Sequence, residues 1–119
     1  QATARSYDIN EMLGTKTRAL MQREQGRDLF ELVHAWQLGE AGSTPYAVDG
    51  AKTMQAFVWY LEQEGTHFSA QEANAHLDVR LGKAGFRRDM DTLLRPGLPA
   101  FDVDRAGEIV REAYFRHLP

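Results

Sequence analysis

The chain has 119 residues, which is enough for one hydrophobic core and too few for two. Apolar residues make up 43% and charged residues 26%, a composition that excludes a disordered or fibrous protein. Fourteen basic against 17 acidic residues give a net charge of −3, which argues against a strongly basic nucleic-acid-binding domain.

Cysteine is absent, so disulfides, zinc ribbons and thiol catalysis are excluded. No apolar run approaches the length of a membrane span, and no signal-peptide pattern opens the chain. We therefore expect a cytoplasmic protein without membrane contact. The chain begins at Gln1 rather than Met, and we keep open that it is a piece of a longer protein.

Apolar residues recur at helical spacing along the chain, and no segment alternates with the period of two that strands show. Asp8 is suited to cap a first helix that begins at Ile9. The apolar residues of this helix fall at helical spacing and are expected to face the core: Met12, Leu13, Ala19 and Leu20. Gly26 interrupts this pattern before a second apolar run over residues 29–38, which we expect to be the most buried helix. Residues 39–45 combine glycine, serine and proline, as is typical of a loop.

Helical spacing continues in the second half of the chain. A third helix is predicted by apolar residues spaced i, i+3, i+4 and i+7, namely Met54, Phe57, Val58 and Leu61. Gly65 would close this helix, and Ser69 with Glu72 forms the capping-box pattern of a fourth. A short fifth helix is expected over residues 86–94, and Asp102 would cap the last one. The sequence predicts an all-α, single compact domain of about six helices over residues 1–119.

The densest polar signal is a group of three cations, Lys16, Arg23 and Arg27. If one helix ran through Gly26, these residues would lie within about 20° of one line. Such a stripe suits phosphate, which arginine binds as a fork and lysine as a point charge. The alternative is a solvated face neutralised by carboxylates such as Glu24.

Asp28 also has two interpretations. With Glu31 it fits a capping box at the start of the second helix, in which case Gly26 ends the first helix and the stripe bends at Arg27. A role for Asp28 at a metal or nucleotide would require a second carboxylate nearby. The residues alone favour the cap.

A second basic cluster follows later in the chain and comprises Arg80, Lys83, Arg87, Arg88 and Arg95. It either contacts a nucleic-acid backbone or forms the exposed side of a short helix, and we favour the latter. The pair Gly42–Ser43, followed by Asp49, lacks the second aspartate of a nucleotidyltransferase motif and is interpreted as a loop. The histidines have no metal-ligand spacing; they are His34, His67, His76 and His117.

Residues 11–32 have the form E-x4-K-x2-AL-x2-R-x3-RD-x2-[DE]-L. This pattern resembles the helical half of the AbiEii/AbiGii family of nucleotidyltransferase-like toxins, the effectors of bacterial abortive-infection toxin–antitoxin systems. Similar segments follow: Gly-Phe-Arg-x-Asp at 85–89, Leu-Leu-x-Pro-Gly at 93–97 and Phe-Asp before the last helix. The resemblance covers nearly the whole chain. It implies a C-terminal helical domain whose N-terminal partner, a mixed α/β nucleotidyltransferase core with Gly-Ser and Asp-x-Asp motifs, is not in this sequence.

The resemblance also implies roles for individual residues. Lys16 would hold the triphosphate, Asp28 would belong to the active site, and Arg23 and Arg27 would lie beside the nucleotide or RNA substrate. Glu31 stands where the family often has aspartate, so we leave it out of the site. Metal-binding aspartates would come from the N-terminal half. We therefore expect no metal site and no activity in this chain alone, with Mg²⁺ and NTP bound only by the longer protein.

The partners implied by the resemblance are the N-terminal nucleotidyltransferase half, an NTP, an RNA target and a repressor-type antitoxin encoded alongside. Two other interpretations stay open. One is a stand-alone interaction or nucleic-acid-binding module that uses the cluster at residues 80–95. The other is a structural domain with an exposed apolar patch around Trp36 or Trp59.

Overall fold

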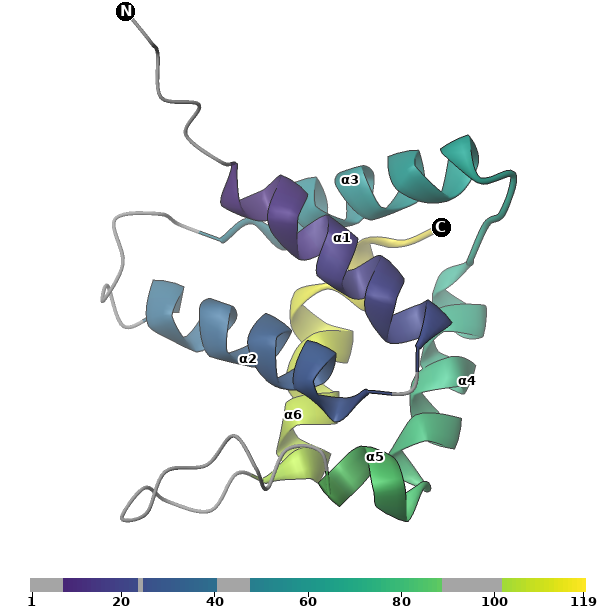
Figure 1. The fold of residues 1–119 in the computed structure, drawn as a ribbon. Coiled ribbons are helices and arrows are strands. Elements are labelled where there is room, and N and C mark those ends of the chain that lie inside the picture. The colour runs from purple at the N-terminus through teal and green to yellow at the C-terminus, as the bar shows by residue number, and fades with distance from the viewer. Residues whose placement is uncertain (1–7, 24, 41–47, 89–101) are drawn as a thin grey trace, which may run out of the picture.

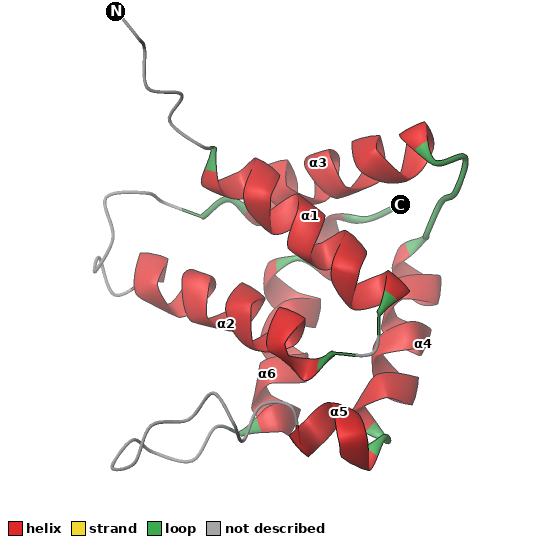
Figure 2. Cartoon of the chain, in the orientation of Figure 1, coloured by secondary structure: helices red, strands yellow, loops and turns green. Residues whose placement is uncertain are grey.

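Helices make up the fold of this protein in a computed structural model that describes residues 8–23, 25–40, 48–88 and 102–119 (Figures 1 and 2). Within these ranges there are six α-helices, one 3-10 helix and no strand. The elements are α1 (Ile9–Gln22), α2 (Gly26–Glu40), α3 (Gly50–Gln63), α4 (Ala70–Leu81), α5 (Ala84–Arg88), α6 (Val103–Ala113) and η2 (Phe115–His117). The prediction of an all-α fold is confirmed.

Several helix ends follow the caps that the sequence predicts. Asp8 and Asp102 accept hydrogen bonds from backbone N–H groups in the first turns of α1 and α6. Ser69 and Glu72 form both halves of the capping box of α4, and the hydrogen bond from the Ser69 backbone holds the pKa of Glu72 below its ordinary value of 4.5. Gly65 follows α3 with a φ of +73°, a conformation that favours glycine.

Helices α1 and α3 approach each other closely at Gly14. A Cβ atom at Gly14 would lie 2.7 Å from the Cβ of Ala56 and 3.0 Å from the backbone nitrogen of Phe57. Only a residue without a side chain lets the two backbones approach this far. In the same contact Asn10 accepts a hydrogen bond of 2.8 Å from the backbone N–H of Asp49, just before α3 begins.

A single hydrophobic core lies between the helices. Leu20 and Phe57, both predicted to be in the core, are fully buried. Tyr114 joins α2 to the C-terminal end of α6, since its hydroxyl donates a hydrogen bond of 2.8 Å to the carbonyl oxygen of Leu32. Burial raises the pKa of Tyr114 well above its ordinary value. The edge of the Trp36 ring also packs against Tyr114, with 5.9 Å between the ring centroids.

Three details differ from the sequence prediction. Met12, expected to face inward, is 37% exposed. The helix over residues 26–40 is not the most buried one: five of its 15 residues are buried, against five of 11 in α6. In its second half, residues 34–40 are all exposed or half-buried. Of the predicted fifth helix, Ala84–Arg88 is observed, and residues 89–101 lie outside the described residues.

Candidate phosphate-binding site at the junction of α1 and α2

The chain turns sharply between the first two helices. Arg23 ends α1 in an extended conformation, with φ −121° and ψ 151°, and α2 begins at Gly26. A single helix through Gly26 is therefore wrong, and so is the prediction that Gly26 ends the first helix. The three cations of the predicted stripe come instead from three places: Lys16 from α1, Arg23 from the turn and Arg27 from the first turn of α2.

Asp28 does not cap α2, because it lies inside the first turn of that helix. Its carboxylate faces back across the turn, where Oδ1 accepts a hydrogen bond of 3.0 Å from Nη2 of Arg23. The side chain of Asp28 is completely buried, and among the described residues its Oδ2 has no hydrogen-bond partner. A buried carboxylate oxygen without a hydrogen-bond donor lowers the stability of the fold. Such a residue is a candidate for a functional role.

Glu31 is the second carboxylate at the junction. Its Oε2 lies 2.6 Å from Nζ of Lys16, and its Oε1 lies 3.9 Å from Nε of Arg27. Glu31 therefore does not reach back to cap the helix, and the predicted capping box with Asp28 is wrong. We left Glu31 out of the site, yet it is the residue that links two of the three cations.

The junction thus combines three cations with two carboxylates in a partly solvated setting. The side chains of Lys16, Arg23 and Arg27 are 34%, 50% and 59% exposed, while Asp28 is fully buried. We name this group the junction cluster: Lys16, Arg23, Arg27, Asp28 and Glu31. Cations that are accessible to a ligand and held in position by neighbouring carboxylates suit the binding of an anion.

The second basic cluster does not form a common surface. Arg80 is only 7% exposed, and its guanidinium donates to the carbonyl oxygens of Leu20 and Met21, at 2.9 and 2.8 Å. These carbonyls belong to the last turn of α1, where backbone acceptors lack partners within the helix. Arg80 is therefore a cap for the C-terminus of α1, and the prediction that it lies on an exposed face is wrong.

The other described members of that cluster differ from one another in their surroundings. Arg87 donates to the carbonyl oxygen of Leu81 and to Asp104, and the hydrogen bond with Asp104 raises the pKa of Arg87. Lys83 and Arg88 are exposed, and Arg95 lies outside the described residues.

Asp49 is the N-cap of α3, where it accepts from the backbone N–H groups of Ala51 and Lys52. The sequence interpretation of Asp49 as a loop residue is therefore corrected: Asp49 caps the start of α3. Gly42 and Ser43 lie outside the described residues. No group of three or more histidine, aspartate or glutamate side chains in the described ranges is arranged to hold a metal ion.

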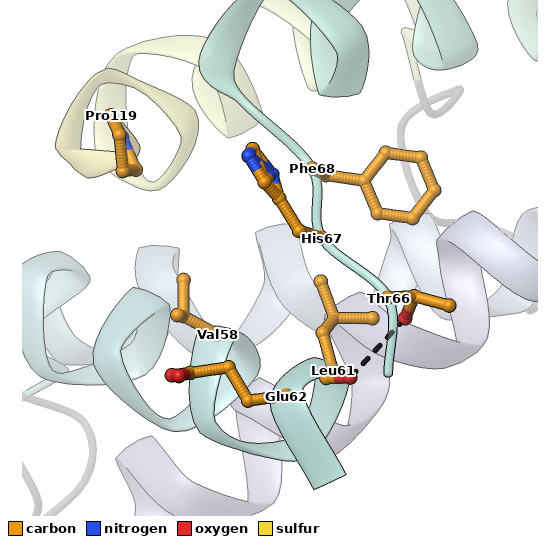
Figure 3. Close-up of a pocket in the computed structure, with 7 residues that line it drawn as sticks. All are labelled: Val58, Leu61, Glu62, Thr66, His67, Phe68 and Pro119. Atoms are coloured by element: carbon orange, nitrogen blue, oxygen red, sulfur yellow. Dashed lines mark hydrogen bonds between the residues drawn. The ribbon is translucent and has the colours of Figure 1, made fainter. Parts of the chain in front are cut away.

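Two hollows among the described residues lie elsewhere. One of about 280 Å³ has its floor on α3 and its wall on the segment that follows (Figure 3). It is lined by Val58, Leu61, Glu62, Thr66, His67, Phe68 and Pro119. A second of about 440 Å³ lies between α1 and α3 beside Trp59, whose ring is 56% exposed. Neither hollow includes a residue of the junction cluster.

The chain matches no protein-family model, no curated protein and no solved structure. A function is therefore inferred from the side chains of the junction cluster and from the resemblance of residues 11–32. In the part of the chain that the structure describes, none of the helices is both long and apolar enough to cross a membrane.

Proposed function

We propose that this chain is the helical, phosphate-binding portion of a toxin-type nucleotidyltransferase. The longer protein would transfer a nucleotide from an NTP to an RNA or protein target in the cytoplasm of a bacterium with an abortive-infection toxin–antitoxin system. The observation that carries the proposal is that three partly exposed cations lie where α1 and α2 meet, with Lys16 and Arg27 paired to Glu31 and Arg23 paired to Asp28.

The chemistry of transfer explains why such a cluster is useful. In nucleotidyl transfer an acceptor hydroxyl attacks the α-phosphorus, the bond to the β-phosphate breaks, and pyrophosphate leaves with its negative charge. Cations that bind the β- and γ-phosphates favour this charge separation. Lys16 and Arg27 would bind the departing phosphates, and the buried Asp28 would hold the half-exposed Arg23 in position beside them.

Mg²⁺ chemistry is assigned to the longer protein. Asp28 is an isolated carboxylate with one cationic partner, and the described residues offer no set of oxygen ligands around it. The described residues around Asp28 therefore do not by themselves fit a magnesium site. Its proposed partners are an N-terminal nucleotidyltransferase core, the NTP, an RNA acceptor and a repressor-type antitoxin.

The complete NTP site would need the longer protein, but the proposed phosphate-binding cations all lie in this chain, so we now expect it to bind the phosphates by itself. Binding of ATP and of inorganic tripolyphosphate to this chain, measured by calorimetry at low salt, tests the proposal. Lys16→Ala is expected to weaken binding about 10- to 100-fold, because it removes a charge-assisted contact. Arg18→Ala is the matched control: Arg18 is 33% exposed on the same helix and pairs with Glu64. Equal weakening by both variants, or no binding at all, would contradict the proposal.

A binding response that depends on Arg88 rather than on Lys16 would favour the nucleic-acid-binding module instead. Thermal unfolding of each variant checks that the fold is retained, which we expect because both side chains are about one-third exposed.

A further inference from the structure

We propose that Glu31 is an internal competitor of the ligand, which makes the junction cluster selective for polyphosphate over single phosphate groups. The inference rests on the proposed function, since it assigns a ligand class to the same cations. It gives Glu31 a role in specificity rather than in binding.

The two oxygens of Glu31 are divided between two cations from different helices. Oε2 pairs with Lys16 of α1 at 2.6 Å, and Oε1 lies 3.9 Å from Nε of Arg27, one turn earlier on α2. One carboxylate thus neutralises both side chains that the proposal assigns to phosphate. A ligand must displace Glu31 before it can use them.

The exposure of these groups makes displacement feasible. The side chains of Glu31 and Lys16 are 33% and 34% exposed, and that of Arg27 is 59% exposed. Ion pairs at this depth contribute little to stability, because water screens them and side-chain entropy opposes them. Glu31 can therefore rotate into solvent without unfolding the helix.

Asp28 differs from Glu31 in this respect. It is fully buried and held by Arg23, so it stays in place when a ligand arrives. The cluster then contains one fixed carboxylate that orients Arg23 and one displaceable carboxylate that covers Lys16 and Arg27.

The charge of the ligand decides whether displacement is favourable. A single phosphate group carries about −1.5 to −2 at pH 7, not far above the −1 of Glu31, and it gains these cations only by displacing Glu31. A tripolyphosphate carries several charges along a chain and can also bind the half-exposed Arg23, which pairs with Asp28 and not with Glu31. Part of its binding therefore needs no displacement of Glu31, so Glu31 penalises small anions more than polyphosphates.

Calorimetric titration of the chain with inorganic phosphate and with inorganic tripolyphosphate tests this inference. Glu31→Gln is expected to tighten phosphate binding about two- to fivefold and tripolyphosphate binding by less, so that the preference for tripolyphosphate narrows. Glu64→Gln is the control. It removes the same charge from a pair of similar exposure, with Arg18, which lies about 200° around α1 from Lys16.

A preference for tripolyphosphate that Glu31→Gln leaves unchanged, or that Glu64→Gln narrows equally, overturns the inference. If Lys16→Ala weakens binding while Glu31→Gln has no effect, the competitor role fails and the proposed function stands. If Lys16→Ala also has no effect, both fail. Glu31→Asp, whose shorter side chain cannot reach both cations, is expected to fall between the wild type and Glu31→Gln, and it keeps the test available if Glu31→Gln is unstable.

Discussion

Arg80 illustrates how a charged residue can belong to the interior of a small helical domain. Its guanidinium binds two carbonyl oxygens at the C-terminus of α1, where the helix dipole is negative. The sequence could not reveal this role, because the acceptors lie about 60 residues away along the chain. In the sequence Arg80 is simply one member of a basic run.

Replacing Arg80 should therefore destabilise the fold. Arg80→Met keeps most of the side-chain volume but leaves the carbonyl groups of Leu20 and Met21 without their charged donor. We expect the free energy of unfolding to fall by about 2–4 kcal/mol, as measured by urea denaturation. Arg88→Met, at an exposed position of α5, is expected to change it by less than about 0.5 kcal/mol. Equal stability of the two variants would refute the capping role.

Asp28 and Arg23 make a second prediction at the scale of single residues. Arg23→Gln leaves the buried carboxylate of Asp28 without its cation and should cost about 1–3 kcal/mol of unfolding free energy. In an Asp28→Asn background the same change should be nearly neutral, because no buried charge remains. Chemical denaturation of the four proteins of this double-mutant cycle gives the coupling energy. Additive effects would mean that the two side chains do not depend on each other.

At the scale of elements, several local caps were predictable, although Asp49, the equally local cap of α3, was interpreted as a loop residue. Asp8, Ser69 and Asp102 accept hydrogen bonds from N–H groups two or three residues ahead, so each cap can be recognised from about four consecutive residues. The start of α2 was misplaced because Asp28 and Glu31 fit the same local pattern. Their carboxylates bind Arg23 and Lys16 instead, and contacts of that kind depend on how α1 and α2 pack.

The crossing of α1 and α3 makes a prediction at this scale. Gly14→Ala would add a methyl group 2.7 Å from the Cβ of Ala56, which requires the two helices to separate. We expect a loss of about 1–3 kcal/mol in urea unfolding, even though alanine favours a helix. Gly85→Ala in α5 is the control, since its new Cβ would meet nothing closer than Arg88 at 4.0 Å. That variant should be unchanged or stabilised, and the prediction fails if Gly14→Ala behaves likewise.

At the scale of the whole molecule, the fold class was predictable because helical periodicity extends along the chain and places residues such as Leu20 and Phe57 inside. The arrangement of the site was only partly predictable. The resemblance singled out Lys16, Arg23, Arg27 and Asp28; Arg23 pairs with Asp28, while Lys16 and Arg27 both pair with Glu31. The linking position of Glu31 follows from tertiary packing, which a linear pattern does not contain.

One core should unfold as one unit. Phe57→Ala removes a completely buried ring at the centre of α3, and we expect a loss of about 3–5 kcal/mol. Trp59→Ala, two residues along the same helix but 56% exposed, should change stability by less than about 0.5 kcal/mol. Far-UV and near-UV circular dichroism followed during denaturation should give the same midpoint for each protein. Comparable losses in both variants would place the core elsewhere.

The central claim is that the junction cluster binds the phosphates of a nucleotide. Amide chemical shifts of the isotope-labelled chain, followed while ATP is added, test it most directly. We predict that the largest shifts occur at Lys16, Arg23 and residues 27–31, and that inorganic tripolyphosphate reproduces them. Shifts confined to residues 80–88, or no shifts at ATP concentrations that saturate ordinary nucleotide sites, would contradict the account.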